Sequence, residues 1–205
     1  MLRMLLMFAS TVFLVGCQTA PTPPPTPPPP PPSVPPAAVA PAGFAPPTAP
    51  QLEATKKAGK VQVKLETDKG DIVLELDGAA APLTVANFVN LVKSGFYDGM
   101  PFHRVEPNFV IQAGAPEAVA KPPVGYTIPD EPSPLKHDKG VIAMARLYRG
   151  NQMVPNSAST QFYLTLAPTP HLDRLGFTVF GRVAQGLEVI QKIAVGDKIR
   201  KATVG

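Results

Sequence analysis

The side chains with which this chain could do metal, acid-base or nucleophilic chemistry are few and widely spaced. It contains three histidines, His103, His137 and His171, and one cysteine, Cys17. None of the histidines has the spacing of a metal-binding motif such as HExxH. A single cysteine can form neither an intramolecular disulfide nor a cysteine-rich zinc site. The sequence therefore predicts no bound metal and excludes a zinc hydrolase.

Two short segments combine glutamine with aromatic and apolar residues in alternation. In an extended strand, Gln161 and Tyr163 share one face and Phe162 points to the other. Val110 and Gln112 share a face in the same way. Because only one face of each strand can pack into a core, we expect the glutamine amides to be free to hydrogen-bond a substrate backbone.

Three other polar residues are interpreted as structural. A strand would place the side chain of His103 opposite that of Arg104, away from any site that Arg104 serves. Asp130 and Glu131 lie in a loop between two prolines, where adjacent extended residues diverge. We expect them to fix the loop rather than to act in catalysis.

The elements that must position these residues are mainly strands. Alternation predicts a hairpin at residues 61–65 and 72–76, and an i, i+3, i+4, i+7 apolar period predicts an amphipathic helix from Pro82 to about Gly95. Further strands are expected at 102–105, 109–113, 141–145, 162–166, 177–183 and 199–204, with a second helix at 187–193. The pattern favours a mainly β fold, a closed antiparallel β-barrel of about eight strands capped by two α-helices.

The composition divides the chain into two materials. Of its 28 prolines, 16 fall between Pro21 and Pro50. Arg3 is the only charged residue before Glu53, so the rest holds 18 basic and 15 acidic residues, a net charge of +3. This charge is too weak and too mixed to indicate nucleic-acid binding.

The first residues are typical of an export signal. Arg3 precedes an apolar run from Met4 to Val15, which is shorter than the roughly 20 residues of a membrane span. The run ends in Leu-Val-Gly-Cys17, which resembles the bacterial lipobox, where cleavage precedes an acylated cysteine. We expect residues 1–16 to be a lipoprotein signal peptide and Cys17 to carry lipid. The alternative is an ordinary signal peptide or an uncleaved anchor.

Residues 17–59 are expected to form a lipidated, proline-rich and disordered tether. Proline fixes φ and lacks an N–H, so this segment favours extended polyproline II, and about 30 residues could reach about 90 Å. A spacer is the simplest interpretation; a docking ligand for a proline-recognising module is the alternative. The residue after Cys17 is not Asp, and in this it resembles Gram-negative lipoproteins that are sorted to the outer membrane. We therefore expect the protein at the outer membrane, facing the periplasm.

Residues 60–205 resemble the cyclophilin peptidyl-prolyl cis-trans isomerases. Five segments match the family in order and near its spacing: Phe102 to Gly114, Pro129 to Glu131, Gly140 to Arg146, Asn156 to Tyr163 and Val179 to Val183. The resemblance implies an isomerase (rotamase) that rotates X-Pro bonds of unfolded or extended chains and assists protein folding in the cell envelope. It implies no cofactor, X-Pro-containing polypeptides as partners, contact with the membrane only through Cys17, and a monomer.

The same resemblance implies the site residues. It assigns Arg104, Phe109 and Gln112 to catalysis. It assigns substrate binding to Val110, Met144, Ala145, Arg146, Gln161, Tyr163, His171, Leu172 and Phe177. Arg146 and Phe177 depart from the residues common in eukaryotic members. The segment 147–155 is longer than the family loop, so Tyr148, Arg149 and Met153 could extend the substrate groove.

Two other functions remain open at the level of sequence. The domain could be a non-catalytic chaperone or adaptor that uses the same groove to bind proline-containing segments. It could also act on its own proline-rich tail.

Overall fold

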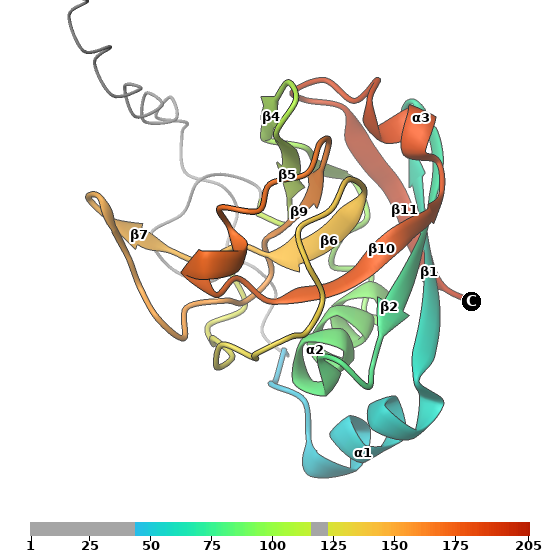
Figure 1. Ribbon diagram of the computed structural model, residues 1–205. Helices are drawn as coiled ribbons and strands as arrows, with labels where there is room; N and C mark the ends of the chain where they lie inside the picture. The colour runs from blue at the N-terminus through green and yellow to red at the C-terminus, as the bar shows by residue number, and fades with distance from the viewer. Residues whose placement is uncertain (1–43, 116–122) are drawn as a thin grey trace, which may run out of the picture. The chain divides into compact units, whose positions relative to one another are not determined.

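The folded part of the chain is built on one strongly curled antiparallel sheet. The computed structural model describes residues 44–115 and 123–205, which belong to one compact unit. The nine strands follow the order β3-β11-β1-β2-β10-β6-β9-β5-β4 (Figure 1). Their bounds are β1 (Lys60–Thr67), β2 (Gly70–Asp77), β3 (Met100–Pro101), β4 (Arg104–Glu106), β5 (Val110–Ala113), β6 (Val141–Met144), β9 (Phe162–Thr165), β10 (Val179–Gln185) and β11 (Lys198–Val204).

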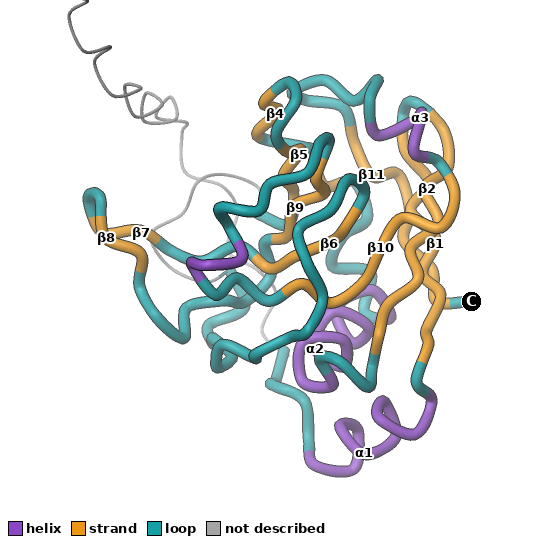
Figure 2. Tube along the Cα trace, viewed as in Figure 1, coloured by secondary structure: helices purple, strands orange, loops and turns teal. Residues whose placement is uncertain are grey.

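A few short elements complete the fold. The helices are α1 (Ala49–Ala58), α2 (Pro82–Lys93) and α3 (Leu187–Ile190), with a 3-10 turn, η1 (Asp173–Leu175). Helix α2 lies at one end of the curled sheet and α3 near the other (Figure 2). Strands β7 (Tyr148–Arg149) and β8 (Gln152–Met153) form a separate hairpin that projects from the body of the domain (Figure 1). The second helix, expected at 187–193, is present as α3 but is only one turn long.

The mainly β fold is confirmed, but the expected closed barrel of eight strands is corrected. The sheet has nine strands, and its edge strands β3 and β4 are not neighbours in the hydrogen-bonded order. Only Phe102 and His103 separate these two strands in the chain. The short connection keeps these two ends of the curled sheet near each other. Because β3 and β4 are not hydrogen-bonded neighbours in the described strand order, the sheet is a half-barrel rather than a closed barrel.

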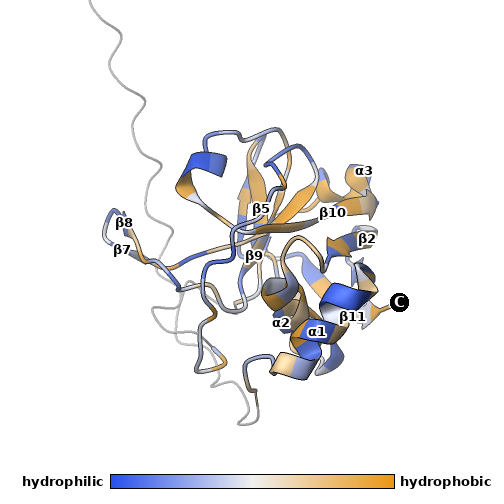
Figure 3. Cartoon of the chain, turned by 60° about the horizontal axis from the view of Figure 1, so that its bottom comes forward, coloured by the Kyte–Doolittle hydropathy of each residue, from blue (hydrophilic) through white to orange (hydrophobic). Residues whose placement is uncertain are grey.

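The main core fills the space between the concave face of the sheet and α2. Phe88 of α2 is fully buried, and its ring centroid lies 5.0 Å from that of Tyr97, 5.3 Å from that of Phe162 and 5.4 Å from that of Phe180. In β1 and β2, Val63, Leu65, Ile72, Leu74 and Leu76 are also fully buried and alternate with more exposed residues. Figure 3 shows this apolar interior along the strands. The predicted hairpin and first helix are confirmed.

The expected tether is corrected at its C-terminal end. Residues 49–58 form α1, although the sequence analysis assigned the whole of 17–59 to a disordered segment. The backbone N–H of Thr48 donates to Oε1 of Gln51 at 2.8 Å, which caps the helix start. Gln51 also donates to Oδ1 of Asn90 on α2 at 3.2 Å. Phe44 packs edge-on against Phe96 at 5.5 Å. The ordered domain therefore begins well before Lys60.

The remaining N-terminal predictions lie outside the described residues. These are the signal peptide, lipidation of Cys17 and most of the tether. Within residues 44–115 and 123–205, no helix is both long and apolar enough to cross a membrane.

A loop residue far away in the chain caps α2. The N-cap residue Ala81 has no side chain that could bind the first free N–H groups of the helix. Instead, the Glu131 carboxylate accepts hydrogen bonds from the N–H groups of Leu83 at 3.0 Å and Thr84 at 2.8 Å. Its negative charge also complements the positive end of the helix dipole. The loop-fixing role expected for Glu131 is confirmed.

Substitution of Glu131 tests this cap. Glu131→Ala leaves two helix N–H groups without their acceptor, and we expect the free energy of unfolding to fall by about 1–2 kcal/mol. Urea unfolding followed by circular dichroism measures the change. Glu188→Ala, at an exposed glutamate, is the matched control. Equal stability of the two variants would contradict the capping role.

Candidate functional site

Four neighbouring strands place a row of side chains on the face of the sheet opposite the main core. Arg104 on β4 is paired with Gln112 on β5, Gln112 with Tyr163 on β9, and Tyr163 with Ala143 on β6. Directly paired residues in neighbouring strands point to the same side of a sheet. A cation, an amide and a phenol from distant segments therefore lie side by side.

The adjacent row faces the main core. Val105, Ile111, Leu164 and Ile142 are paired in sequence across the same strands, and the last three are fully buried. Met144 also belongs to the main core cluster and is 1% exposed. The prediction of Met144 as a substrate-binding residue is thereby corrected, since strand alternation directs its side chain inward.

Arg104 is held by two acceptors and keeps part of its donor capacity. Its Nη1 donates to Oε1 of Gln112 at 3.1 Å, and its Nε and Nη2 donate to Oε1 of Glu106 at 3.0 and 2.9 Å. The side chain is 34% exposed. A guanidinium has five N–H donors, so three contacts leave two free. Gln112 is fixed in turn, because its Nε2 donates to Oε1 of Gln161 at 2.8 Å.

A tight turn places Phe109 beside Arg104. Asn108 has a positive φ of 59°, a conformation that asparagine tolerates better than most residues. The N–H of Phe109 donates to the Glu106 carbonyl at 3.0 Å, which closes the turn. The Arg104 guanidinium carbon then lies 5.7 Å from the centroid of the Phe109 ring, which stacks on the His171 ring at 5.7 Å.

A second apolar cluster lies next to this cation. Its buried members are Val110, Val141, Ala143, Tyr163, Leu172 and Val179, with Phe109, Leu135, Ala145 and Phe177 partly buried at its edge. The Phe177 ring meets the Tyr163 ring edge-on at 5.9 Å. Burial raises the pKa of the Tyr163 phenol well above its usual range, so the hydroxyl stays protonated. The cluster offers aromatic and aliphatic walls to a small apolar group.

Most of the predicted site residues are thus brought together, but the side chain of Arg146 is engaged elsewhere. Its Nε lies 2.8 Å from Oδ1 of Asp130, and its terminal nitrogens donate to the carbonyls of Leu175 and Gly176. The guanidinium carbon lies 5.3 Å from the centroid of the Phe177 ring. With 7% of its side chain exposed, Arg146 fastens the turn that carries Phe177. The substrate-binding role expected for Arg146 stays a prediction.

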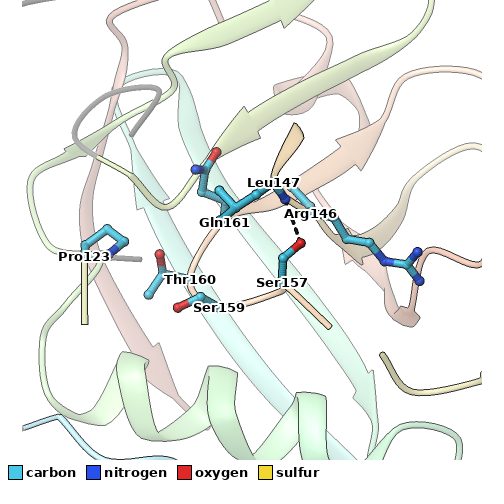
Figure 4. Close-up of a pocket in the computed structure, with 8 residues that line it drawn as sticks. Pro123, Arg146, Leu147, Ser157, Ser159, Thr160 and Gln161 are labelled. Carbon is cyan, nitrogen blue, oxygen red and sulfur yellow. Dashed lines mark hydrogen bonds between the residues drawn. The ribbon is translucent and has the colours of Figure 1, made fainter. Parts of the chain in front are cut away.

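A pocket opens beside the row, on the side of Gln161. It is small, and it is lined by Pro123, Ala145, Arg146, Leu147, Ser157, Ser159, Thr160 and Gln161 (Figure 4). The side chain of Arg146 points away from this space (Figure 4). The Leu147 N–H donates to Oγ of Ser157 at 2.9 Å, which holds the pocket rim together.

His103 is a partly buried histidine next to Arg104, and its surroundings within the described part of the chain do not resemble a metal site. His103 lies between β3 and β4, and its Nδ1 is buried without a partner among the described residues. Burial first, and then the charge of Arg104, lowers the pKa of His103 below its usual value. Within residues 44–115 and 123–205, no cluster of three or more His, Cys, Asp or Glu side chains could hold a metal ion.

Two residues of the site were missed by sequence reasoning. Glu106 is two residues after Arg104 on the same strand, so alternation alone could have placed both on one face. His137 bonds to Tyr163 from a loop 26 residues away. No local pattern connects His137 with Tyr163, so nothing in the sequence indicated this contact.

Comparisons with known proteins agree on one family. The model of the family "Cyclophilin type peptidyl-prolyl cis-trans isomerase/CLD" matches residues 62–204. A peptidyl-prolyl cis-trans isomerase of Synechococcus elongatus is 41% identical over 140 residues, which cover 67% of this chain and 92% of the relative. Peptidyl-prolyl cis-trans isomerase B of Bacillus subtilis is 40% identical over 139 residues, which cover 67% and 92% of the two chains.

Solved structures show the same likeness. The crystal structure of a cyclophilin-type isomerase from Cryptosporidium parvum has a TM-score of 0.63 and 26% identity, covering 71% of this chain and 98% of its own. A second structure of that protein, obtained in the presence of the dipeptide Ala-Pro, has a TM-score of 0.62 and 27% identity, with coverage of 70% and 98%.

The fastening role of Arg146 is testable by stability. Arg146→Ala removes the partner of a partly buried carboxylate and the contact with the Phe177 ring, so we expect a loss of about 3 kcal/mol in the free energy of unfolding. Arg146→Lys should recover little, because an ammonium lacks the planar fork. The control is Arg149→Ala, at an exposed arginine three residues away. Urea unfolding measures all three, and a loss no larger than that of the control would contradict this role.

Proposed function

The chain belongs to the cyclophilin-type peptidyl-prolyl cis-trans isomerases, and from this premise we propose that Arg104 and the neighbouring apolar cluster form its catalytic site. The enzyme accelerates rotation about peptide bonds that precede proline. The observation that carries the proposal is the row Arg104, Gln112 and Tyr163, with Phe109 against the guanidinium and two N–H groups free.

The chemistry of the reaction determines what such a site must supply. Rotation about a peptide bond meets a barrier of about 18–20 kcal/mol, because the nitrogen lone pair is delocalised into the carbonyl. No bond is made or broken, so no nucleophile is required. A tenfold acceleration corresponds to about 1.4 kcal/mol off the barrier. The enzyme must hold the proline ring and stabilise the twisted amide more strongly than the planar one.

The apolar cluster suits the proline ring. Phe109, Val110, Tyr163, Leu172 and Phe177 pack together next to Arg104, with Val110, Tyr163 and Leu172 buried beneath the partly buried Phe109 and Phe177. Burying the ring among them removes apolar surface from water, while the rest of the substrate chain remains free to turn. Two aromatic walls, Phe109 and Phe177, are only partly buried and so remain accessible to a substrate.

The guanidinium supplies the stabilisation of the twisted state. In that state the nitrogen lone pair is localised, and an N–H group of Arg104 can donate to it. Glu106 and Gln112 hold the guanidinium in place before the substrate arrives. Gln112 is bonded to both Arg104 and Gln161, so the amide nitrogen of Gln161 is the group that can donate to the substrate backbone. A donor fixed in advance does not lose free energy to reorientation during the reaction.

The substrates are X-Pro bonds in unfolded or extended polypeptides. A related isomerase from Cryptosporidium parvum was crystallised in the presence of the dipeptide Ala-Pro, which supports a small X-Pro unit as the recognised element. The site lies on an outer face of the sheet, so an extended chain can pass over it.

Substitution of Arg104 tests the mechanism. We expect Arg104→Ala to lower the catalysed rate of cis-trans exchange by about 10²- to 10³-fold, the usual effect of removing one transition-state donor. Exchange of a short Ala-Pro peptide is measured by NMR line broadening with the purified full chain. Arg182→Ala, at an exposed arginine on β10 that pairs with Glu75 at 3.2 Å, makes the same change of charge and should keep the wild-type rate.

Two outcomes would overturn the proposal. Full activity of Arg104→Ala would show that the guanidinium is not the stabilising group. Absence of exchange at any concentration of the wild-type protein, together with binding of proline-containing peptides, would favour the non-catalytic binding module considered above.

We further propose that the enzyme acts in the cell envelope as a lipoprotein. The support comes from the sequence: Arg3, the apolar run to Val15 and the Leu-Val-Gly-Cys17 pattern. Two or three acyl chains on Cys17 anchor stably, because each buried CH₂ contributes about 0.8 kcal/mol. The proline-rich segment would then hold the domain away from the outer membrane, where exported chains with X-Pro bonds fold.

Mass spectrometry of the mature N-terminus tests the anchor. The expected chain begins at Cys17 and carries the mass of its acyl chains. In Cys17→Ala the modification should be lost and the protein should leave the membrane fraction. An unmodified Cys17, or a chain that still begins with Met1, would refute the lipoprotein assignment.

A further inference from the structure

Three side chains form a continuous hydrogen-bonded chain behind the apolar cluster. Nδ1 of His137 lies 2.7 Å from Oδ1 of Asp173, and Nε2 of His137 lies 2.9 Å from the hydroxyl of Tyr163. The His137 side chain is 1% exposed, and its ring is stacked on that of Tyr163 with a centroid distance of 6.0 Å. The catalytic proposal uses neither His137 nor Asp173.

The partners of His137 determine the direction of both bonds. The backbone N–H of His137 also donates to Oδ1 of Asp173, at 3.0 Å. The contacts with His137 lower the pKa of Asp173, so it is an ionised carboxylate that only accepts. Nδ1 of neutral His137 must then carry the proton, and Nε2 accepts the hydrogen bond that the Tyr163 hydroxyl donates.

The chain connects two parts of the proline pocket that are distant in sequence. Tyr163 is the buried floor on β9, and it is paired with Gln112. Asp173 opens η1, directly after the wall residue Leu172 and shortly before Phe177. A second hydrogen bond joins His137 to the same loop: the Thr169 N–H donates to the His137 carbonyl at 2.8 Å. His137 thus fastens the loop that carries the pocket wall to the strand that carries its floor.

We propose that His137 and Asp173 are positioning residues of the isomerase, which fix the Tyr163 ring and the 169–177 loop at the spacing that a proline ring requires. This inference rests on the proposed catalytic site and deepens it, since neither residue touches the substrate. A pocket that is loosened by a small displacement binds its substrate less tightly and aligns it less well with Arg104.

The same arrangement makes substrate binding sensitive to acid. The groups that face His137 are Asp173 from η1, the Tyr163 hydroxyl from β9, His171 from the loop before η1 and Lys136 from its own loop. Burial lowers the pKa of His137 below its ordinary value of 6.5, and Asp173 opposes that shift.

Protonation reverses one bond of the chain. Below the lowered pKa, His137 takes up a proton and its Nε2 becomes a donor, so the Tyr163 hydroxyl must turn to accept and its own proton loses its acceptor. The bond between His137 and Tyr163 remains with its direction reversed, but the buried Tyr163 O–H is left without an acceptor, which disfavours this arrangement of the Tyr163 ring in the acid form. KM therefore rises as the pH falls through this lowered pKa and is lowest where His137 is neutral.

The test compares three substitutions in the full chain. His137→Leu removes both bonds, and we expect KM to rise about tenfold with a smaller change in kcat. His137→Gln keeps an acceptor for the Tyr163 hydroxyl but does not titrate, so its KM should stay within about threefold of wild type. Lys139→Gln, at an exposed residue of the same loop, is the control for the loop itself.

The pH profile separates a positioning role from a merely structural one. Between about pH 5 and 7.5, KM of the wild type should rise toward acid, and this rise should be absent in His137→Gln. An identical acid rise in both proteins would overturn the inference, as would a wild-type KM in His137→Leu. The Arg104→Ala variant distinguishes the two proposals. If Arg104→Ala loses activity while the His137 variants keep the wild-type KM, the catalytic site stands and only the positioning role is refuted.

Discussion

The register of four neighbouring strands is the constraint on which the site depends. Arg104, Gln112, Tyr163 and Ala143 are paired one to the next across β4, β5, β9 and β6. Because side chains alternate along a strand, a slip of one residue in any pair would turn the catalytic residue inward and a core residue outward. The buried row beside it, which includes Ile111 and Leu164, opposes such a slip, since it would expose apolar surface. The main core thus holds in place the row that contains Arg104, Gln112 and Tyr163.

Outside the strands, charged and polar contacts between loops take over this role. The loop beside the second apolar cluster, residues 169–177, contains only one turn of 3-10 helix. Arg146 holds its far end through Asp130 and two carbonyls, and His137 holds its near end through Asp173. Such buried polar pairs form only when donor and acceptor are correctly aligned. They therefore fix the position of the loop more than they add to the stability of the domain.

Sequence reasoning succeeded where local periodicity carries the information, and it failed where distant segments meet. The hairpin of β1 and β2 and helix α2 follow from apolar spacing alone. Helix α1 was missed because its sequence is polar and follows a proline-rich segment, although Thr48 and Gln51 form a recognisable capping box. Strand alternation could also have predicted that the Met144 side chain points into the core. Arg146 lies just beyond β6, where no period applies, so only the fold shows that it binds Asp130.

By itself, the sequence determined that a proline-rich segment precedes one mainly β domain, that the domain resembles an isomerase family, and which residues match its motifs. These properties are local, because composition, alternation and motif order can be read along the chain. Only the tertiary structure decided which matched residues lie together and that His137 joins Tyr163 to Asp173. Those contacts depend on strand register and loop closure, which bring together residues that are distant in the chain, such as Gln112 and Gln161, 49 positions apart.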